Sequence, residues 1–327
     1  MTVPLTEFRI VRPNHLDEAV AARQAHPSGR FIAGGTDLLV NMRHGINRPD
    51  VLIDLSGLPE LSGLRCGSDG ATIGASVTIA ALARNTAIAA QYPALVQAAS
   101  SIAGPGHRAM GTVGGNLCLD TRCNYYNQSE WWRRSNGYCL KSGGDTCRVA
   151  PKGARCHAAF TGDLAPALLV LAADVEIAGP AGLRRVPLAG IYADDGRAHL
   201  TLADGELIVA VRLPANPFSS AYEKIRLRRS IDYPLAGVAT ALSIADARIA
   251  ALRIALTGTN SRPFLLDGTG DLTGHAIDEQ TLQRIDRMVQ KQVQPMRTTL
   301  VPANYRRLTA AAVARRLVAK LSEDFRG

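Results

Sequence analysis

The sequence contains no long run of apolar residues. Its most apolar stretch, residues 164–173, is interrupted by Pro166 and is followed by Asp174. This is far short of the roughly 20 residues that a membrane-spanning helix needs. Residues 1–13 carry three charged side chains and no apolar segment of the length found in signal peptides. We therefore expect a soluble, cytoplasmic protein.

Internal repeats and low-complexity tails are also missing. The 327 residues are 46% hydrophobic and 20% charged, which is ordinary for globular proteins and excludes disordered and fibrous classes. The length allows two or three compact domains. A formal net charge of +9 is most simply a solvated basic surface. A nucleic acid, an anionic cofactor or an acidic protein partner would also account for it.

The two common nucleotide-binding motifs are absent. No Gly-x-Gly-x-x-Gly stands at a strand–helix junction, and no Gly-Lys-Ser/Thr sequence marks a P-loop. Two other glycine-rich segments are present, at residues 34–37 (GGTD) and 111–116 (GTVGGN). Glycines let a backbone approach a ligand closely, and N–H groups at a helix start attract phosphate. Together the two segments indicate a nucleotide-like ligand gripped from two sides, with plain tight turns as the alternative.

Cys-x-x-Cys pairs are absent as well. Four of the six cysteines nevertheless fall between residues 123 and 156. Clustered thiols in a reducing compartment indicate metal binding or redox chemistry before disulfides. Structural zinc, an iron–sulfur cluster and unligated thiols all remain open from the spacing alone. The four clustered thiols are Cys123, Cys139, Cys147 and Cys156.

Apolar periodicity predicts alternating strands and helices, with domain boundaries near Gly57 and Pro217. Residues 120–157 show little periodicity, and a loop of this length is usually functional. The predicted helices are 16–24, 38–43, 78–84, 93–102, 164–172, 278–293 and 303–321. The predicted strands are 30–33, 51–55, 71–75, 174–178, 206–213, 221–227, 237–244 and 248–256.

Four ordered motifs resemble those of the FAD-binding medium subunits of the xanthine dehydrogenase and carbon monoxide dehydrogenase family of molybdenum hydroxylases. They are 31–38 (FIAGGTDL), 111–116 (GTVGGN), 162–169 (GDLAPALL) and a stretch from Tyr222 to Ala239 that contains Lys224, Arg228 and Asp232. The resemblance implies an α+β fold. A two-part α/β FAD-binding domain of the type-2, PCMH-like kind would cover residues 1–58 and 59–217, with a cysteine-rich insertion at 120–157. A smaller α/β C-terminal domain, 218–327, would contain a three-stranded antiparallel sheet and helices.

The resemblance also implies roles for individual residues. Backbone amides of the two glycine segments, with Thr36 and Thr112, would hold the FAD pyrophosphate. Ile102 and Ile208 would pack on the flavin ring, and Lys224 would lie near it. Asp163 would bind cofactor hydroxyls; a helix cap for Asp163 and a solvated strand lysine for Lys224 are the alternatives. The full cofactor set is Arg30, Phe31, Ile32, Ala33, Gly34, Gly35, Thr36, Asp37, Ile102, Gly111, Thr112, Val113, Gly114, Gly115, Asn116, Asp163, Ile208 and Lys224.

The insertion at 120–157 resembles that of the β subunits of 4-hydroxybenzoyl-CoA reductases. This resemblance implies that Cys123, Cys139, Cys147 and Cys156 bind a [4Fe–4S] cluster. Cys118 would belong to the flavin segment and Cys66 to the core. Neighbouring aromatic side chains would shield the cluster, and neighbouring basic ones would offset its negative charge.

The implied function is electron transfer, with no catalytic residue in this chain. Electrons from ferredoxin would pass through [4Fe–4S] and FAD to [2Fe–2S] and molybdenum subunits, for reductive dehydroxylation of 4-hydroxybenzoyl-CoA in aromatic degradation. The complex would be a dimer of heterotrimers. One alternative is the FAD subunit of an ordinary molybdenum hydroxylase with an NAD or quinone acceptor and a structural metal in the insertion. Another is a basic nucleic-acid-binding protein.

Overall fold

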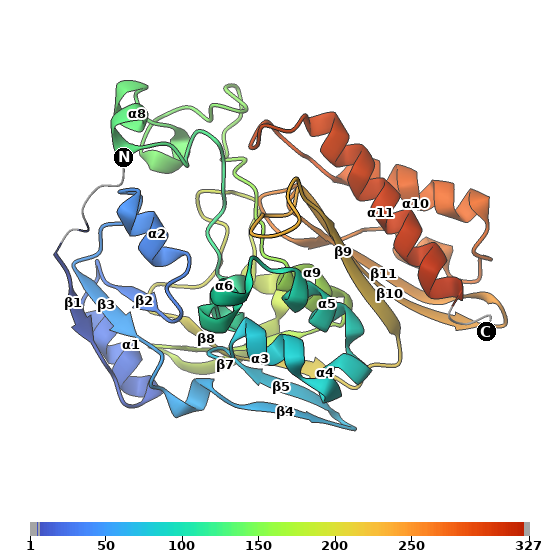
Figure 1. Cartoon of the computed structure of the whole chain (residues 1–327), viewed down its shortest axis with the longest axis horizontal. Helices are drawn as coiled ribbons and strands as arrows, with labels where there is room; N and C mark the ends of the chain where they lie inside the picture. The colour runs from blue at the N-terminus through green and yellow to red at the C-terminus, as the bar shows by residue number, and fades with distance from the viewer. Residues whose placement is uncertain (1–4, 6, 324–327) are drawn as a thin grey trace.

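The computed structural model describes residue 5 and residues 7–323, in which the strands form three sheets (Figure 1). The N-terminal sheet is parallel, in the order β1-β3-β2, and each crossover contains a helix, as parallel neighbours require. Its central strand is a short buried apolar run. The elements are β1 (Arg9–Val11), α1 (Leu16–Ala25), β2 (Arg30–Ile32), α2 (Leu38–Arg43) and β3 (Val51–Asp54).

The second sheet is antiparallel, in the order β4-β5-β8-β6-β7. The first five residues of its central strand β8 are all buried, which explains why residues 207–211 are a continuous apolar run rather than an alternating one. The strands are β4 (Leu64–Gly67), β5 (Gly70–Gly74), β6 (Asp174–Gly179), β7 (Gly182–Pro187) and β8 (Leu207–Pro214).

Short helices pack around this sheet and enclose the largest core. Thr78 accepts a hydrogen bond from the N–H of Ala81 at 3.1 Å and is the N-cap of α3, at the start of the helix predicted over 78–84. Every residue of α9 is buried, because the helix lies between α5 and the C-terminal strands β10 and β11. The elements are η1 (Pro59–Leu61), α3 (Ile79–Arg84), α4 (Thr86–Gln91), α5 (Pro93–Ser101), α6 (Pro105–Met110), α7 (Val113–Leu117), α9 (Leu164–Val170) and η3 (Leu188–Ile191).

The C-terminal part is a four-stranded antiparallel sheet, in the order β12-β11-β10-β9. Helix α11 contacts β9 and β10 and packs against α10, so both helices lie over one face (Figure 1). Three strands match the predicted ones, and the fourth is the two-residue β12, too short to show a sequence pattern. The elements are β9 (Ser219–Ile225), β10 (Ala236–Ala245), β11 (Arg248–Thr257), β12 (Phe264–Leu265), η4 (Thr269–Leu272), α10 (Glu279–Gln292) and α11 (Ala303–Glu323).

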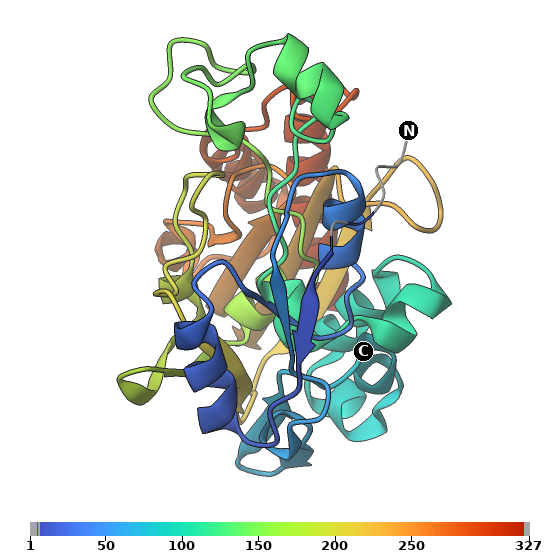
Figure 2. The same ribbon diagram turned by 90° about the vertical axis from the view of Figure 1, so that its left-hand side faces the viewer.

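The insertion extends from one end of the molecule beside the start of α11 (Figures 1 and 2). Our expectation of a structureless loop is wrong in part, because it contains α8 (Glu130–Ser135) and η2 (Leu140–Ser142). Arg133 explains this local order. Its guanidinium is buried and donates to the backbone oxygens of Tyr126 and Gln128 and to the Glu130 carboxylate. The charged side chain therefore adds to the small apolar cluster around Cys123, Tyr126, Cys156 and Ala158.

No helix among residues 7–323 is both long and apolar enough to cross a membrane.

Candidate functional site

A cleft of about 960 Å³ lies among β2, α2, α7 and the base of the insertion. This volume is at the upper end of the range for small-molecule sites, roughly 300–1,000 Å³. We call it the glycine-loop cleft, because both glycine segments line it. Fourteen of the eighteen residues predicted to bind the cofactor line this cleft: Arg30, Phe31, Ile32, Ala33, Gly34, Gly35, Thr36, Asp37, Ile102, Gly111, Thr112, Gly115, Asn116 and Asp163.

The two glycine segments touch each other at Gly34. A Cβ atom at this position would lie 1.8 Å from the carbonyl oxygen of Met110, so no other residue fits without moving the backbone. Gly35 follows with φ +66°, in the left-handed region that glycine adopts without cost. The glycine-rich sequence predicted a close approach of the backbone to a ligand. In the structure, Gly34 makes a close approach between the two glycine segments themselves.

The second segment is a capped helix rather than a loop. Thr112 is the N-cap of α7 and its Oγ1 accepts from the N–H of Gly115 at 3.2 Å. Asn116 fixes the other end of the segment, because its Oδ1 accepts from the N–H of Leu164 at 3.1 Å. Asn116 thus fills the capping role that was the alternative for Asp163, whose side chain makes no cap hydrogen bond.

Four predicted residues lie outside the lining of the cleft. Val113 is buried in the core, and Gly114 packs so closely on Ala75 that a Cβ atom would lie 2.8 Å from its methyl group. Ile208 also faces the core, beside the register shift between β6 and β8. Lys224 turns toward Asp163 and is only 3% exposed, so it is not the solvated strand lysine that we weighed.

Asp163 joins the cleft wall to the C-terminal domain. Its Oδ1 accepts from the hydroxyl of Tyr222 at 2.6 Å, and its Oδ2 lies 3.1 Å from Lys224 Nζ. Burial raises the pKa of Asp163 and lowers that of Lys224, and each charge offsets part of the other's shift. Both carboxylate oxygens are engaged by protein, and one face of the residue still reaches the cleft.

Sequence reasoning missed a second ion pair in the cleft, between Arg122 and Asp37. Asn41 donates to the other oxygen of Asp37 at 2.9 Å, so the carboxylate is fixed from two sides. Arg122 is adjacent to Cys123, and the pairing therefore joins the insertion to the first glycine segment. Three buried polar atoms of the lining, Asn41 Oδ1, Arg122 Nε and Thr161 Oγ1, have no hydrogen-bond partner among the described residues. Such atoms call for a ligand or water.

Other lining residues come from segments without a periodic pattern. The chain between β9 and β10 contributes Arg228, Ile231, Asp232 and Tyr233. Arg228 and Asp232 are named residues of the fourth sequence motif. That motif was the signal in the sequence that could have pointed to this part of the lining. His199 lines the cleft from the chain before β8, and burial lowers its pKa to about 4, so its imidazole is neutral near pH 7.

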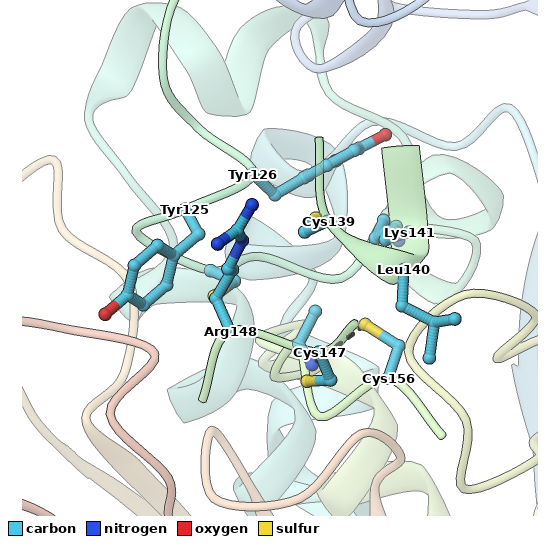
Figure 3. A pocket seen from close by; sticks show the side chains of 10 residues that line it. Tyr125, Tyr126, Cys139, Leu140, Lys141, Cys147, Arg148 and Cys156 are labelled. Atoms are coloured by element: carbon cyan, nitrogen blue, oxygen red, sulfur yellow. Dashed lines mark hydrogen bonds between the residues drawn. The ribbon is translucent and has the colours of Figure 1, made fainter. Parts of the chain in front are cut away.

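All four clustered cysteines line one small cavity in the insertion, which we call the thiol cavity (Figure 3). Cys123, Cys147 and Cys156 are buried, and Cys139 is half-buried. Burial raises the pKa of Cys123 and of Cys156 to about 11, so the free thiols stay protonated near pH 7. The cavity contains no carboxylate or imidazole; its other lining residues are Tyr125, Tyr126, Leu140, Lys141, Arg148 and Ala158.

The remaining two cysteines lie elsewhere. Cys118 lines the glycine-loop cleft, and Cys66 lies on β4 beside the main core. Two expectations for the insertion are wrong for individual residues. Trp131 was expected to shield the thiols, but it is 74% exposed. Arg133 was expected to offset the charge of a cluster, but its guanidinium is paired with the Glu130 carboxylate. Within residues 7–323, no group of three or more histidine, cysteine, aspartate or glutamate side chains is arranged so that it could hold a metal ion.

Comparison with known proteins gives matches along nearly the whole chain. Residues 6–216 match the model of the FAD binding domain in molybdopterin dehydrogenase, and residues 220–321 that of the CO dehydrogenase flavoprotein C-terminal domain. The chain is 28% identical over 314 residues to the carbon monoxide dehydrogenase medium chain of Afipia carboxidovorans, covering 95% of each. It is 34% identical over 271 residues to the aldehyde oxidoreductase FAD-binding subunit of Escherichia coli K12, covering 80% of this chain and 84% of the other. The reconstituted CO dehydrogenase structure from Oligotropha carboxidovorans superposes with a TM-score of 0.80 at 25% identity, covering 98% of this chain and 99% of the other.

Proposed function

The chain belongs to the family of FAD-binding subunits of molybdenum hydroxylases, and from this premise we propose that it is the electron-transfer subunit of such a complex. The single observation that carries the proposal is the glycine-loop cleft, which is built from both glycine segments and from Asp163. The chemistry that FAD supplies there is reversible uptake and release of electrons. Companion subunits with molybdenum and [2Fe–2S] centres would complete the complex, as a dimer of heterotrimers.

The residues of the cleft fit FAD. The contact between Gly34 and the Met110 carbonyl leaves both backbones at the surface of the cleft, where a pyrophosphate can approach them. Arg122 Nε and Thr161 Oγ1, which have no protein partner in the described part of the chain, are suited to the ligand's oxygens. Ile32 and Ile102 offer apolar surface to its rings.

The named relatives favour an ordinary hydroxylase, since they include xanthine dehydrogenase, carbon monoxide dehydrogenase and aldehyde oxidoreductase subunits. Our first candidate for the reaction is therefore oxidation of a small substrate on the molybdenum subunit. Electrons would then leave through FAD to an external acceptor. Reductive dehydroxylation of 4-hydroxybenzoyl-CoA, with ferredoxin as donor, is the second candidate. The specific observation in its favour is the thiol cavity, which brings together four cysteines that lie far apart in the sequence.

We further propose that Cys123, Cys139, Cys147 and Cys156 hold a [4Fe–4S] cluster. The donor set fits, because thiolates are the ligands of such clusters and the cavity offers thiols without carboxylate or imidazole. In the free chain the described cysteines are not arranged to hold a metal ion, so either a zinc ion or a cluster would have to draw the four sulfurs together. A structural zinc on four thiolates would use the same ligands, at bonds of about 2.3 Å. The iron, sulfide and zinc contents of the complex distinguish the two.

The assembled complex provides the test. Purified with its companion subunits, it should contain one FAD per heterotrimer, and each copy of this subunit should add about four iron and four acid-labile sulfide to those of the [2Fe–2S] subunit. Iron at the [2Fe–2S] level with one zinc would leave the flavin proposal intact and replace the cluster with a structural metal. Tight, salt-sensitive oligonucleotide binding without flavin would instead support the nucleic-acid-binding alternative.

A further inference from the structure

The glycine-loop cleft and the thiol cavity are separated by two side chains. Tyr126 and Lys141 line both spaces, and no other described residue does. Figure 3 shows both side chains at the edge of the thiol cavity. The ammonium group of Lys141 lies 4.8 Å from the centre of the Tyr126 ring, so the two form one partition held partly by a cation–π contact.

Lys141 is fixed in this partition by three short contacts. Its Nζ lies 2.6 Å from Asp120 Oδ1, 2.6 Å from Thr121 Oγ1 and 2.5 Å from the carbonyl oxygen of Gly196. A lysine ammonium has three donors, and all three are used. Its side chain is 5% exposed, so the charge is both buried and immobile.

The same contacts connect three of the four thiol-bearing segments. Asp120 and Thr121 lead into Cys123, and Lys141 itself lies two residues after Cys139. Gly196 donates its N–H to the carbonyl oxygen of Cys156 at 2.8 Å. Only Cys147 is outside this arrangement. Arg148, which also lines the cavity, is exposed, whereas Lys141 lines the cleft as well.

The charge of Lys141 is only partly offset. Its one anionic partner, Asp120, is 26% exposed and therefore better screened by water. The neighbouring Arg122 is already paired with Asp37, and His199 is neutral near pH 7 because burial lowers its pKa. A buried cation stabilises an electron added beside it more strongly than a solvated cation does.

We propose that Lys141 is a positioning residue that sets the reduction potential of the centre held in the thiol cavity, by placing a fixed positive charge between that centre and the flavin. The inference rests on the proposed function. It goes beyond it by assigning a role in electron transfer to a residue that binds neither group. Charge and hydrogen bonds near a cluster are among the factors that set its potential.

The test is a redox titration of the assembled complex, followed by electron paramagnetic resonance. In Lys141→Met the midpoint potential of the [4Fe–4S] centre should shift to more negative values, whereas Lys141→Arg should stay near wild type. Asp120→Asn removes the offsetting anion and should shift the potential in the opposite, positive direction. Lys152→Met removes an exposed charge of the same insertion and is the matched control, expected to change nothing.

Opposite shifts of the midpoint potential in Lys141→Met and Asp120→Asn distinguish an effect of charge from a change of structure. A loosened insertion would shift the potential of both variants in the same direction. If Lys141→Met loses its iron, its potential cannot be measured and Asp120→Asn becomes the test. An unshifted midpoint potential of the [4Fe–4S] centre in Asp120→Asn then overturns the inference. If the wild-type complex lacks the cluster, the cluster proposal has failed separately. Lys141 would then act on a flavin held in the glycine-loop cleft, which it also lines, and flavin potentials that are equal in Lys141→Met, Asp120→Asn and wild type overturn the inference.

Discussion

Lys224 Nζ lies 3.1 Å from Asp163 Oδ2, and the two side chains are 3% and 6% exposed. The pair joins β9 of the C-terminal domain to the residue before α9, at the wall of the glycine-loop cleft. One domain therefore supplies the cation that makes burial of the other domain's carboxylate tolerable. The wall of the glycine-loop cleft depends on the C-terminal domain even though that domain contributes little of the lining.

Breaking this pair should be costly. Asp163→Asn leaves Lys224 buried without a countercharge, and the expected loss in unfolding free energy is about 3–5 kcal/mol. Adding Lys224→Met should recover part of that loss, because no lone charge remains. Denaturant titrations of the three variants measure the coupling.

Glu223→Gln provides the matched control on the same strand. Glu223 pairs with Arg316 at the surface, where both side chains are well exposed. Exposed pairs contribute about 0–1 kcal/mol. Equal losses in Asp163→Asn and Glu223→Gln would contradict the argument from burial.

Gly34→Ala should abolish FAD binding. The added methyl group would overlap the Met110 carbonyl oxygen, so the two glycine segments must separate. Gly106→Ala is the control, because a Cβ atom there meets nothing within 4 Å and α6 accommodates alanine readily. The measurement is flavin released per protein on heat denaturation. A full flavin content in Gly34→Ala would show that the contact is not needed.

His199 should make the protein less stable in mild acid. Its pKa is about 4 in the folded state, below the unfolded value of about 6.5. The unfolded state therefore binds more protons between these values, and unfolding free energy falls as the pH is lowered from 6.5 toward 4. The contribution of this group is about 3 kcal/mol. His199→Gln should lose correspondingly less stability over that window, and identical pH profiles would refute the assignment.

Cys139→Ser should remove the part of the broad iron–sulfur absorption that this subunit contributes and leave the FAD and [2Fe–2S] bands in place. Cys139 is the most exposed of the four thiols in the cavity, so its replacement disturbs packing least. Cys66→Ser is the matched control, since Cys66 lies on β4, away from the thiol cavity. An unchanged spectrum in Cys139→Ser would exclude it as a ligand.

Regular elements were readily predicted from sequence, because periodic burial leaves a periodic pattern. The predicted helix at 303–321 corresponds to α11, and the predicted strand at 237–244 to β10. The missed elements are short or exposed: β7 has almost no buried residue, and β12 has two residues. Helix α8 was missed because a buried arginine rather than an apolar face holds it in place.

The candidate site was predicted where local motifs specify it and missed where distant segments meet. The sequence indicated that Gly34 and Gly35 allow a close approach of the backbone. In the structure Gly34 contacts the Met110 carbonyl, and Gly35 adopts a positive φ. The pairing of Arg122 with Asp37 joins residues 85 positions apart, and no local pattern encodes it. The resemblance implied that Ile208 packs on the flavin ring, whereas in the structure its side chain belongs to the core and does not line the cleft.

The thiol-bearing insertion is held in place by chain that is synthesised much later. The N–H of Asn124 donates to the carbonyl oxygen of Thr298, and Ser261 Oγ donates to that of Cys156. Ribosomes add about 5–20 residues per second, so the cysteines are exposed for several seconds before their supports exist. Loading of the proposed cluster would therefore be a late step that follows synthesis of these supports, and a truncated C-terminal end should leave the thiols open to oxidation.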